Sequence, residues 1–341
     1  MIMILNSWQV LLAVFFISFL MVFVFTPLLI RKLRNMKMLS ADMNKKSKPM
    51  LPKMGGITIM LGFILATLVS LQLYPAMAVP TMLASICTIS LIAFLGMMDD
   101  VLSIRDLYRV VLPTFAALPL MAVSAGTSWI TLPFIGVVKL VVGPLSIPLI
   151  GTIASLNLYA LLLIPIGVVA CSNLVNMLAG FNGLEVGSGA VISLSLLLFI
   201  LLNPVQTGST VEAAILLTAL LGACIAFLFY NWHPAKLFPG NITTYVIGAV
   251  LVCAVVIGNM ERVGVIALIP QIIEFFLKAR GFFKAENFGE ERKGRLYYEG
   301  KVYSLTHLFM KYLHPTEKQL VVLLLIIQAI FGLIAVSSLY W

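Results

Sequence analysis

The chain has 341 residues, of which 61% are hydrophobic and only 10% are charged, and its formal net charge is +9. Soluble globular domains are roughly 45–50% apolar and about 25% charged, so this composition excludes an ordinary soluble domain and indicates an integral membrane protein. No charged tail, repeat or low-complexity segment divides the chain, and we therefore expect one domain over residues 1–341.

The apolar segments predict an all-α polytopic fold with about ten transmembrane helices, since about 20 residues cross the hydrocarbon of a bilayer. Pro270 is expected to kink or break the ninth of them, because proline cannot donate a helical hydrogen bond. The first is too long to be a cleavable signal peptide. The predicted spans are residues 8–30, 54–73, 78–98, 107–125, 154–172, 187–203, 211–231, 242–259, 263–279 and 318–340.

Two loops have strand-like patterns. The loop 126–153 is rich in Gly, Pro and β-branched residues, which favours a short hairpin against the membrane. In the last long loop, the residues from Gly294 to Tyr303 alternate and turn at Gly300, which predicts a small two-stranded cytoplasmic ribbon.

Basic residues lie almost entirely on one side of the predicted spans. The loop 31–53 carries eight of them, whereas the opposite side has only Lys139 and Arg262. The positive-inside rule then places the basic loops in the cytoplasm and both termini outside. The basic groups suit either anionic lipid headgroups or a phosphate substrate, and for Arg280 and Lys284, near the end of the ninth span, we favour the substrate.

Asp99 and Asp100 end the third apolar segment without a polar spacer. Adjacent like charges at a membrane boundary are costly, which indicates a functional use. Neighbouring helical positions point about 100° apart, so one carboxylate is expected to act as a base while the other orients a cation or a basic group. The alternative is a solvated helix end paired to Arg105 or Arg109.

Several asparagines and one phenylalanine near the ends of later predicted spans are further candidates for a binding site. Asn173 and Asn176 share a helix face, and Asn182 lies in a turn before Glu185. Amide groups can ligate a metal or bind a nucleobase edge, although asparagines also cap helices. Phe238 precedes Pro239-Gly240, and an aromatic face exposed at such a turn can stack on a base.

Glu274 lies within the predicted ninth span. A carboxylate at membrane depth is a functional candidate. Pairing with Lys278, four residues later on the same helix face, is the alternative.

Four motifs in order resemble the polyprenyl-phosphate N-acetylhexosamine-1-phosphate transferases, and most closely the archaeal and eukaryotic branch that acts on dolichyl phosphate. The motifs are Pro-Lys-Met-Gly-Gly-Ile (52–57), Asp-Asp-Val-Leu-Ser-Ile-Arg (99–105), Asn-Met-Leu-Ala-Gly-Phe-Asn-Gly-Leu-Glu (176–185) and Asn-Trp-His-Pro-Ala-Lys-Leu-Phe-Pro-Gly (231–240).

The resemblance implies ten spanning helices and a cytoplasmic active site that transfers a sugar-1-phosphate, expected to be N-acetylglucosamine 1-phosphate, from a UDP-sugar to a polyprenyl phosphate. It implies Mg²⁺, or alternatively Mn²⁺, as cofactor and no nucleic-acid partner. Carried over by motif, the essential pair is Asp99 and Asp100, the metal positions are Asn176 and Asn241, and the substrate positions are Asn182, Glu185, Phe238 and Arg280. Arg109, Asn173 and Lys284 are further expected substrate-binding residues.

One departure from the family pattern affects the expected activity. The family usually has Asp where this chain has Asn241, and loss of a carboxylate is expected to weaken Mg²⁺ binding. The alternatives to an active enzyme are therefore an impaired member that binds UDP-sugar or lipid without turnover, and a transporter of lipid-linked substrates. We expect an archaeal cell membrane, or alternatively the endoplasmic reticulum, and a homodimer remains open.

Overall fold

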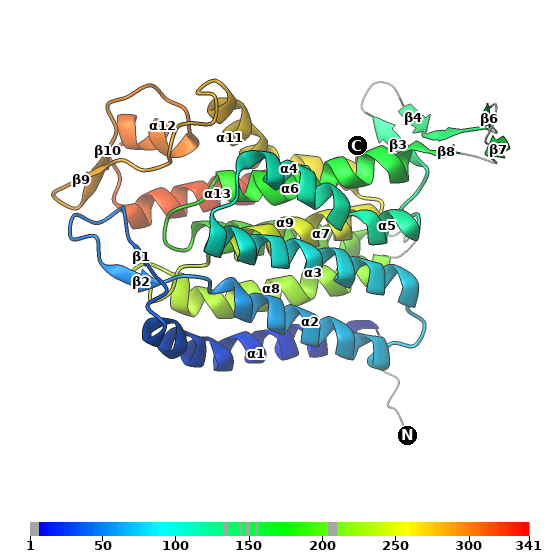
Figure 1. Cartoon of the computed structure of the whole chain (residues 1–341), viewed down its shortest axis with the longest axis horizontal. Helices are drawn as coiled ribbons and strands as arrows, with labels where there is room; N and C mark the ends of the chain where they lie inside the picture. The colour runs from blue at the N-terminus through cyan, green and yellow to red at the C-terminus, as the bar shows by residue number, and fades with distance from the viewer. Residues whose placement is uncertain are drawn as a thin grey trace.

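The structure, a computed structural model, describes residues 7–132, 136–143, 145–147, 151–153, 156–203 and 210–340. Its long helices lie side by side in one bundle (Figure 1). In chain order the helices are α1 Ser7–Asn35, α2 Gly56–Leu73, α3 Val79–Leu102, α4 Asp106–Ala116, α5 Leu118–Ala122, α6 Ile164–Met177, α7 Leu184–Leu202, α8 Thr210–Asn231, α9 Asn241–Ile257, α10 Glu261–Ala267, α11 Ile269–Ala279, α12 Leu305–Tyr312 and α13 Glu317–Ser337. A π-helical turn, Tyr159–Leu163, leads into α6, and a 3-10 turn, Ser338–Tyr340, follows α13.

The protein is a multi-pass membrane protein, but the predicted count of ten spans is not confirmed. Seven helices of the described part are long and apolar enough to cross a membrane: Ser7–Asn35, Gly56–Leu73, Val79–Leu102, Tyr159–Met177, Leu184–Leu202, Thr210–Asn231 and Glu317–Tyr340. The predicted eighth span corresponds to α9, which has 17 residues.

Prolines divide the other two predicted spans. Pro119 lies in the first turn of α5, so the predicted span 107–125 is split at Ala117 into α4 and α5. Pro270 lies in the first turn of α11, and the ninth span is split at Leu268 into α10 and α11. Because proline has no N–H to donate, each break falls beside it, and the predicted break at Pro270 is confirmed.

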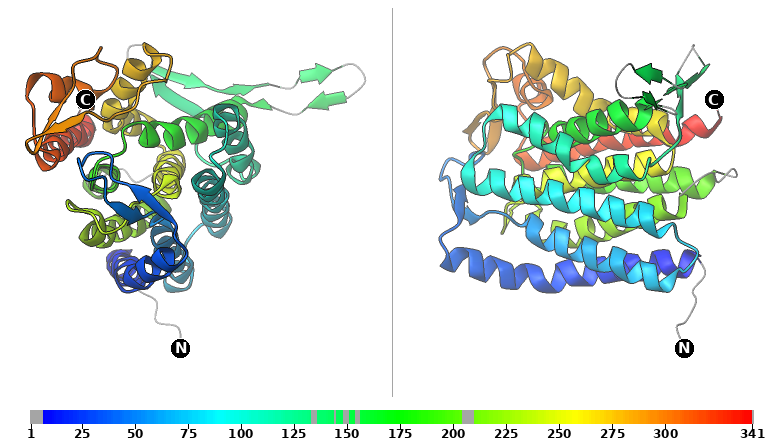
Figure 2. Two further views of the ribbon diagram at one scale, coloured as in Figure 1. Left: turned by 60° about the vertical axis from the view of Figure 1, so that its left-hand side comes forward. Right: turned by 45° about the vertical axis from the view of Figure 1, so that its right-hand side comes forward.

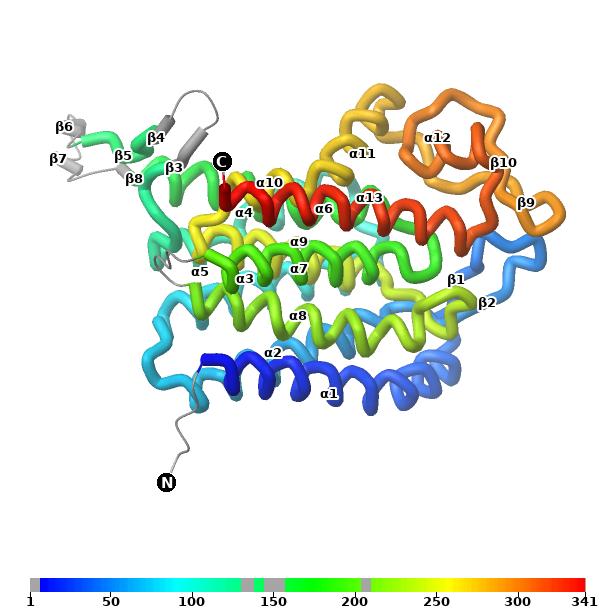
Figure 3. Tube along the Cα trace, turned by 180° about the vertical axis from the view of Figure 1, so that it is seen from behind, coloured from blue at the N-terminus to red at the C-terminus, as the bar shows by residue number. Residues whose placement is uncertain are grey.

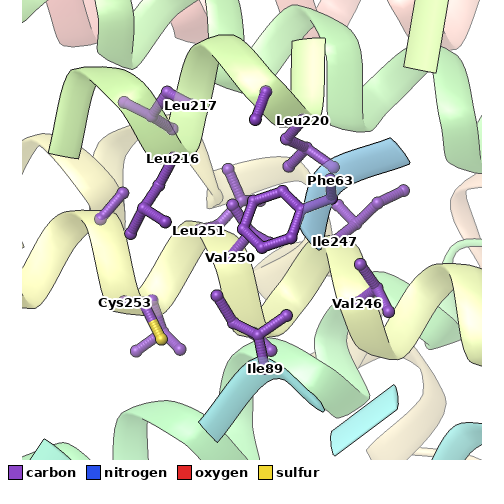
Figure 4. Packing of buried hydrophobic residues seen from close by; sticks show 14 of the residues in the cluster. Phe63, Ile89, Leu216, Leu217, Leu220, Val246, Ile247, Val250, Leu251 and Cys253 are labelled. Atoms are coloured by element: carbon purple, nitrogen blue, oxygen red, sulfur yellow. The ribbon is translucent and has the colours of Figure 1, made fainter. Parts of the chain in front are cut away.

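Helix α9 forms the centre of the bundle. Every residue from Ile242 to Ala254 is buried, as expected for a helix that is apolar on all sides and surrounded by other helices. Helices α2, α3, α6, α7 and α8 all contact it. Figure 4 shows side chains such as Phe63, Ile89 and Leu220 from three of these helices meeting Val246 and Val250 of α9. The first turn of α9 is therefore held firmly in place.

The two ends of the bundle differ. The described starting residues of α1 and the end of α13 lie at the same end as the strands β3 Trp129–Leu132, β4 Gly136–Lys139, β5 Val141–Val142, β6 Leu145–Ile147, β7 Gly151–Ile153 and β8 Leu156–Asn157 (Figures 1 and 3). These strands pair as β3·β4, β5·β8 and β6·β7. They form a ribbon that projects from the helices (Figure 2). Strands are thus present in the predicted hairpin loop 126–153, of which residues 133–135, 144 and 148–150 lie outside the described residues.

The opposite end carries the strands β1 Leu39–Ala41, β2 Met50–Pro52, β9 Glu290–Arg292 and β10 Arg295–Tyr297, together with α12 (Figure 1). A ribbon is present in the last long loop, but it turns at Lys293-Gly294 and not at Gly300. The prediction placed it several residues too late, because Lys293 adopts a positive φ of 52° and supplies the tight turn together with Gly294. Gly300 contacts Tyr298 instead.

Candidate active site

A cavity of about 480 Å³ opens at the end of the bundle that carries β1, β2, β9 and β10. Its walls come from the loop after α1, the end of α3, the turn between α6 and α7, the loop before α9 and the segment after α11. Of the eleven site residues predicted from the sequence, six line it: Asp100, Asn176, Asn182, Glu185, Phe238 and Asn241.

Asp99 and Asp100 point to different partners. Asp99 accepts hydrogen bonds from Arg109 (Nη2 to Oδ1, 3.0 Å), from the Ile104 N–H (3.1 Å), from Asn241 Nδ2 (3.0 Å) and from the Tyr245 hydroxyl (3.3 Å). Its side chain is fully buried. Four donors fix the position of this carboxylate, so Asp99 joins α3, α4 and α9.

Asp100 binds the first turn of α9. Its Oδ1 accepts from the Asn241 N–H at 2.9 Å and its Oδ2 from the Ile242 N–H at 3.1 Å. These N–H groups lack partners within the helix, and a helix N-terminus favours negative charge. Gly240 makes this approach possible: its φ is +77°, and a Cβ there would lie 2.5 Å from Asp100 Oδ2.

Asn241 is bonded to both carboxylates, through its backbone to Asp100 and through Nδ2 to Asp99. The other polar atom of its side chain is Oδ1. Asn176, in the last turn of α6, accepts a hydrogen bond at Oδ1 from Thr244 Oγ1 at 3.0 Å. Oxygen atoms from three helices, on Asp100, Asn176 and Asn241, therefore face one cavity.

Phe238 is held by strand-like pairing with the segment before α2. Its N–H donates to the Pro52 carbonyl at 2.8 Å, and its carbonyl accepts from the Gly55 N–H at 2.9 Å. Between these contacts, Lys53 donates from Nζ to the Asp100 carbonyl at 2.9 Å. The aromatic ring and an ammonium group thus reach the cavity wall from one rigid pair of segments.

The part of the cavity between α6 and α7 is rich in polar groups. Glu185 accepts the Gly180 N–H at Oε1 (2.6 Å), while its buried Oε2 has no partner among the described residues. Asn182 donates from Nδ2 to Asp42 Oδ2 at 3.3 Å, and its N–H donates to Glu317 at 3.1 Å. The turn between the two helices is therefore fixed by carboxylates on either side.

The loop between β1 and β2 borders the same region. Asp42 is 1% exposed and binds Lys45 (2.6 Å) as well as Asn182. Farther along, the Lys46 N–H reaches Glu291 of β9 at 3.1 Å. The N–H of Gly294, and then that of Lys46, lower the pKa of the Glu291 carboxyl from its ordinary value.

Five predicted site residues do not line the cavity. Asp99 and Arg109 form the ion pair beneath it, so the pairing to Arg109 in the alternative is present for Asp99, but the helix end is buried and not solvated. Asn173 donates to the Arg109 carbonyl at 3.0 Å and to the Val169 carbonyl at 2.8 Å, which joins α6 to α4. Arg280 and Lys284 are exposed and lie outside the lining residues.

The last turn of α11 and the segment after it reach the cavity through residues that the sequence analysis did not assign to the site. Lys278 and Asn287 line it where Arg280 and Lys284 had been expected. Lys278 Nζ lies 4.0 Å from Glu274, which also accepts the Leu305 N–H at 2.8 Å, so the predicted Glu274–Lys278 pairing is present. Asp42 was missed as well, although a single acid within a strongly basic loop is a signal that could have identified it.

Comparison with known proteins identifies the family of this chain. The sequence model of glycosyl transferase family 4 matches residues 82–259. A protein of Saccharolobus solfataricus, provisionally named UDP-N-acetylglucosamine–dolichyl-phosphate N-acetylglucosaminephosphotransferase, is 38% identical over 94% of both chains. One of Sulfolobus acidocaldarius with the same provisional name is 34% identical over 86% of both chains.

A more distant relative carries that name without the qualification. The UDP-N-acetylglucosamine–dolichyl-phosphate N-acetylglucosaminephosphotransferase of Dictyostelium discoideum is 27% identical over 85% of this chain and 78% of its own. The family match covers half of the chain, and the archaeal similarity extends over nearly all of it. This chain therefore belongs to glycosyl transferase family 4.

Proposed function

We propose that this protein transfers a sugar-1-phosphate, expected to be N-acetylglucosamine 1-phosphate, from a UDP-sugar to dolichyl phosphate or a related polyprenyl phosphate, and releases UMP. The observation that carries the proposal is the convergence of Asp100, Asn176, Asn241 and Phe238 on one cavity at one end of the bundle. The names of the archaeal and Dictyostelium relatives support the same substrates.

In the proposed reaction, an oxygen of the lipid phosphate attacks the β-phosphorus of the UDP-sugar. The bond between that phosphorus and the bridging oxygen breaks, UMP leaves with the bridging oxygen, and a lipid-diphosphate sugar remains. Positioning and charge neutralisation do most of the work in such transfers. Lys53 and Lys278 supply positive charge at the cavity wall, and Asp100 would orient the attacking group or accept a proton.

A divalent cation fits the donor set of this cavity. Each carboxylate oxygen of Asp100 accepts one backbone N–H and keeps a second lone pair. Mg²⁺ binds oxygen ligands and usually takes one or two carboxylates plus substrate phosphates and water. Asp100, Asn176 and Asn241 would hold it, and it would neutralise charge on the diphosphate.

The diphosphate is needed to complete such a site. Within the described ranges, no group of three or more His, Cys, Asp or Glu side chains could hold a metal by itself. We therefore expect tight metal binding only together with the nucleotide sugar.

The cavity is proposed to open to the cytoplasm. It lies at the end of the bundle formed by the basic loops, and the start of α1 and the end of α13 lie at the other (Figure 3), which is the orientation that the positive-inside rule predicts. A polyprenyl tail stays in the bilayer, so the enzyme has to bind its phosphate at the membrane surface. The host membrane would be an archaeal cell membrane or, alternatively, the endoplasmic reticulum.

One assay tests the proposal. Purified protein is incubated with UDP-N-acetylglucosamine, a short polyprenyl phosphate and Mg²⁺, and UMP release is measured. We expect release that depends on the lipid and falls about 10²- to 10³-fold in Asp100→Asn, since removal of one group aimed at developing charge commonly costs that much. Absence of lipid-dependent UMP release from the unmodified protein would contradict the proposal.

Asn241 favours a second candidate, a member that binds UDP-sugar but turns it over slowly. The side chain provides an amide where the family usually has a carboxylate, and it uses Nδ2 on Asp99. Calorimetric binding of UDP-N-acetylglucosamine without UMP release would identify this case. Restored release in Asn241→Asp would show that position 241 limits the metal.

A further inference from the structure

Asn287 fastens the segment after α11 to the turn that follows α6. Its Nδ2 donates to the Met177 carbonyl at 2.8 Å and to the Ala179 carbonyl at 2.7 Å. Its own carbonyl accepts from Thr306 Oγ1 at 2.8 Å. Both protons of the side-chain amide are therefore committed to one turn, and the orientation of the side chain is fixed.

The remaining polar atom of Asn287 has no protein partner. The residue is 6% exposed, and its Oδ1 is buried without a hydrogen bond among the described residues. Buried polar atoms in native proteins are nearly always paired, and each exception needs an explanation. Because Asn287 lines the cavity, a bound ligand can supply the missing donor.

A second acceptor without a partner lies on the other side of the same turn. Glu185 accepts the Gly180 N–H at Oε1, and its Oε2 is buried and unpaired within the described part of the chain. Asn287 and Glu185 thus both hold the turn of residues 177–180, both line the cavity, and each keeps one buried oxygen without a partner among the described residues. Two such acceptors call for a ligand that donates N–H or O–H groups.

We propose that Asn287 is a substrate-contacting residue whose Oδ1 accepts a hydrogen bond from the UDP-sugar. The inference rests on the proposed function. Ionised phosphate oxygens only accept hydrogen bonds, so the contact involves a group outside the diphosphate. The nucleoside offers the uracil N–H and the ribose hydroxyls as donors, and the sugar offers its hydroxyls and its acetamido N–H. In either case the contacting group is an uncharged hydrogen-bond donor of the nucleotide sugar.

The test compares Asn287→Ala with Thr306→Val in binding and turnover. Thr306→Val keeps the side-chain shape and loses the hydroxyl that holds the Asn287 carbonyl, so it loosens the same segment without touching Oδ1. Calorimetry with UMP and with UDP-N-acetylglucosamine is run on the intact protein, and UMP release is measured in parallel. If the alanine variant does not purify, Asn287→Ser replaces it.

We expect Asn287→Ala to weaken ligand binding about tenfold, the effect of one lost hydrogen bond whose buried donor stays unpaired, and Thr306→Val to change it less than twofold. A loss for both ligands assigns the donor to the nucleoside, and a loss for UDP-N-acetylglucosamine alone assigns it to the sugar. Equal affinities in Asn287→Ala and the unmodified protein, or equal losses in both variants, would overturn the inference. The proposed function itself fails separately, if the unmodified protein releases no UMP.

Discussion

Two walls of the cavity are built in opposite ways. In the wall of α3 and α9, Asp100 accepts two hydrogen bonds, and Asp99 directly beneath this wall accepts four, all from protein groups. In the wall of the turn 177–180 and the segment after α11, Glu185 and Asn287 each keep one buried oxygen unpaired. Every carboxylate oxygen of Asp99 and Asp100 has a protein partner, whereas two buried oxygens of the second wall have none among the described residues.

The difference separates two tasks. Carboxylates fixed by helix ends and an arginine cost no reorganisation when charge develops, which is how preorganised sites stabilise transition states. An unpaired buried acceptor destabilises the protein until a ligand donates a hydrogen bond to it. The site therefore discriminates between ligands that carry the donor and ligands that lack it. We therefore expect variants of the first wall to affect folding and chemistry together, and variants of the second to affect binding.

The largest effect is expected from Asp99→Ala. The change leaves Arg109 without its buried carboxylate, and breaking a buried ion pair by removing one partner costs about 3–5 kcal/mol. The melting temperature in detergent and UMP release should both fall strongly. Asp106→Ala is the matched control, because Asp106 also contacts Arg109, at 3.4 Å, but its side chain is 98% exposed. Similar melting temperatures for the two variants would contradict the structural role of Asp99.

Asn241→Asp tests the same wall by adding charge. Asn241 Nδ2 lies 3.0 Å from Asp99 Oδ2, so a carboxylate there replaces a hydrogen bond with repulsion, and the free energy of unfolding should fall by about 1–3 kcal/mol without metal. Mg²⁺ and UDP-sugar should restore it. Asn241→Ala loses the same hydrogen bond without adding charge, and its melting temperature should not respond to Mg²⁺ alone. If neither melting temperature responds to Mg²⁺ and nucleotide, position 241 does not contact the metal.

The sequence motifs predicted the first wall well, for a physical reason. Asp99, Asp100 and Asn241 lie at ends of long apolar segments, and helix boundaries there follow from composition and from the turn signal Pro239-Gly240. Segments that begin or end on one side of a bilayer bring such residues to one surface. The sequence could not assign partners, however: Asn173 and Asn176 share a helix face, but one bonds to α4 and the other faces the cavity.

The second wall was predicted only in part. Asn182 and Glu185 follow from a family motif, whereas Lys278 lies in the last turn of α11 and Asn287 belongs to the long polar loop after it, whose path depends on tertiary contacts. Glu274 shows the difficulty, because it binds the first N–H of α12, 31 positions later in the chain. No local periodicity encodes such a contact, and for this reason the place of Lys278 in the cavity wall was missed.

Lys278→Met sharpens the comparison on the second wall. The variant keeps an unbranched side chain and removes the only charge that α11 places on the cavity wall, and we expect the KM for UDP-sugar to rise about tenfold, as for loss of one charge-assisted contact. Glu274→Gln removes the partner carboxylate while its amide oxygen can still accept the Leu305 N–H. If Lys278→Met and Glu274→Gln raise the KM equally, Lys278 acts through Glu274. A larger effect of Arg280→Met would instead favour the assignment made from sequence.

The smallest effect is expected from His307, which lies behind the second wall. Its ring stacks on Tyr298 with centroids 3.7 Å apart and is 1% exposed. Burial lowers the pKa of His307 below its ordinary value of about 6.5, and the positive charge of Lys278 acts in the same direction, against the opposing backbone contact with Glu286. The folded state thus binds this proton less readily than the unfolded state does.

Between its folded pKa and about 6.5, the unfolded chain holds more protons, and stability rises with pH. The contribution of His307 is therefore complete above pH 6.5 and is lost as the pH falls through the folded pKa. His307→Phe keeps an aromatic ring on Tyr298 but cannot titrate. On going from pH 7.5 to pH 5, we expect the melting temperature of the unmodified protein to fall by about 2–4 °C more than that of the variant, the shift for roughly 1 kcal/mol. An equal fall in both proteins would show that His307 takes up its proton without cost, and hence that the segment after α11 is too loosely packed to hold Asn287 in place.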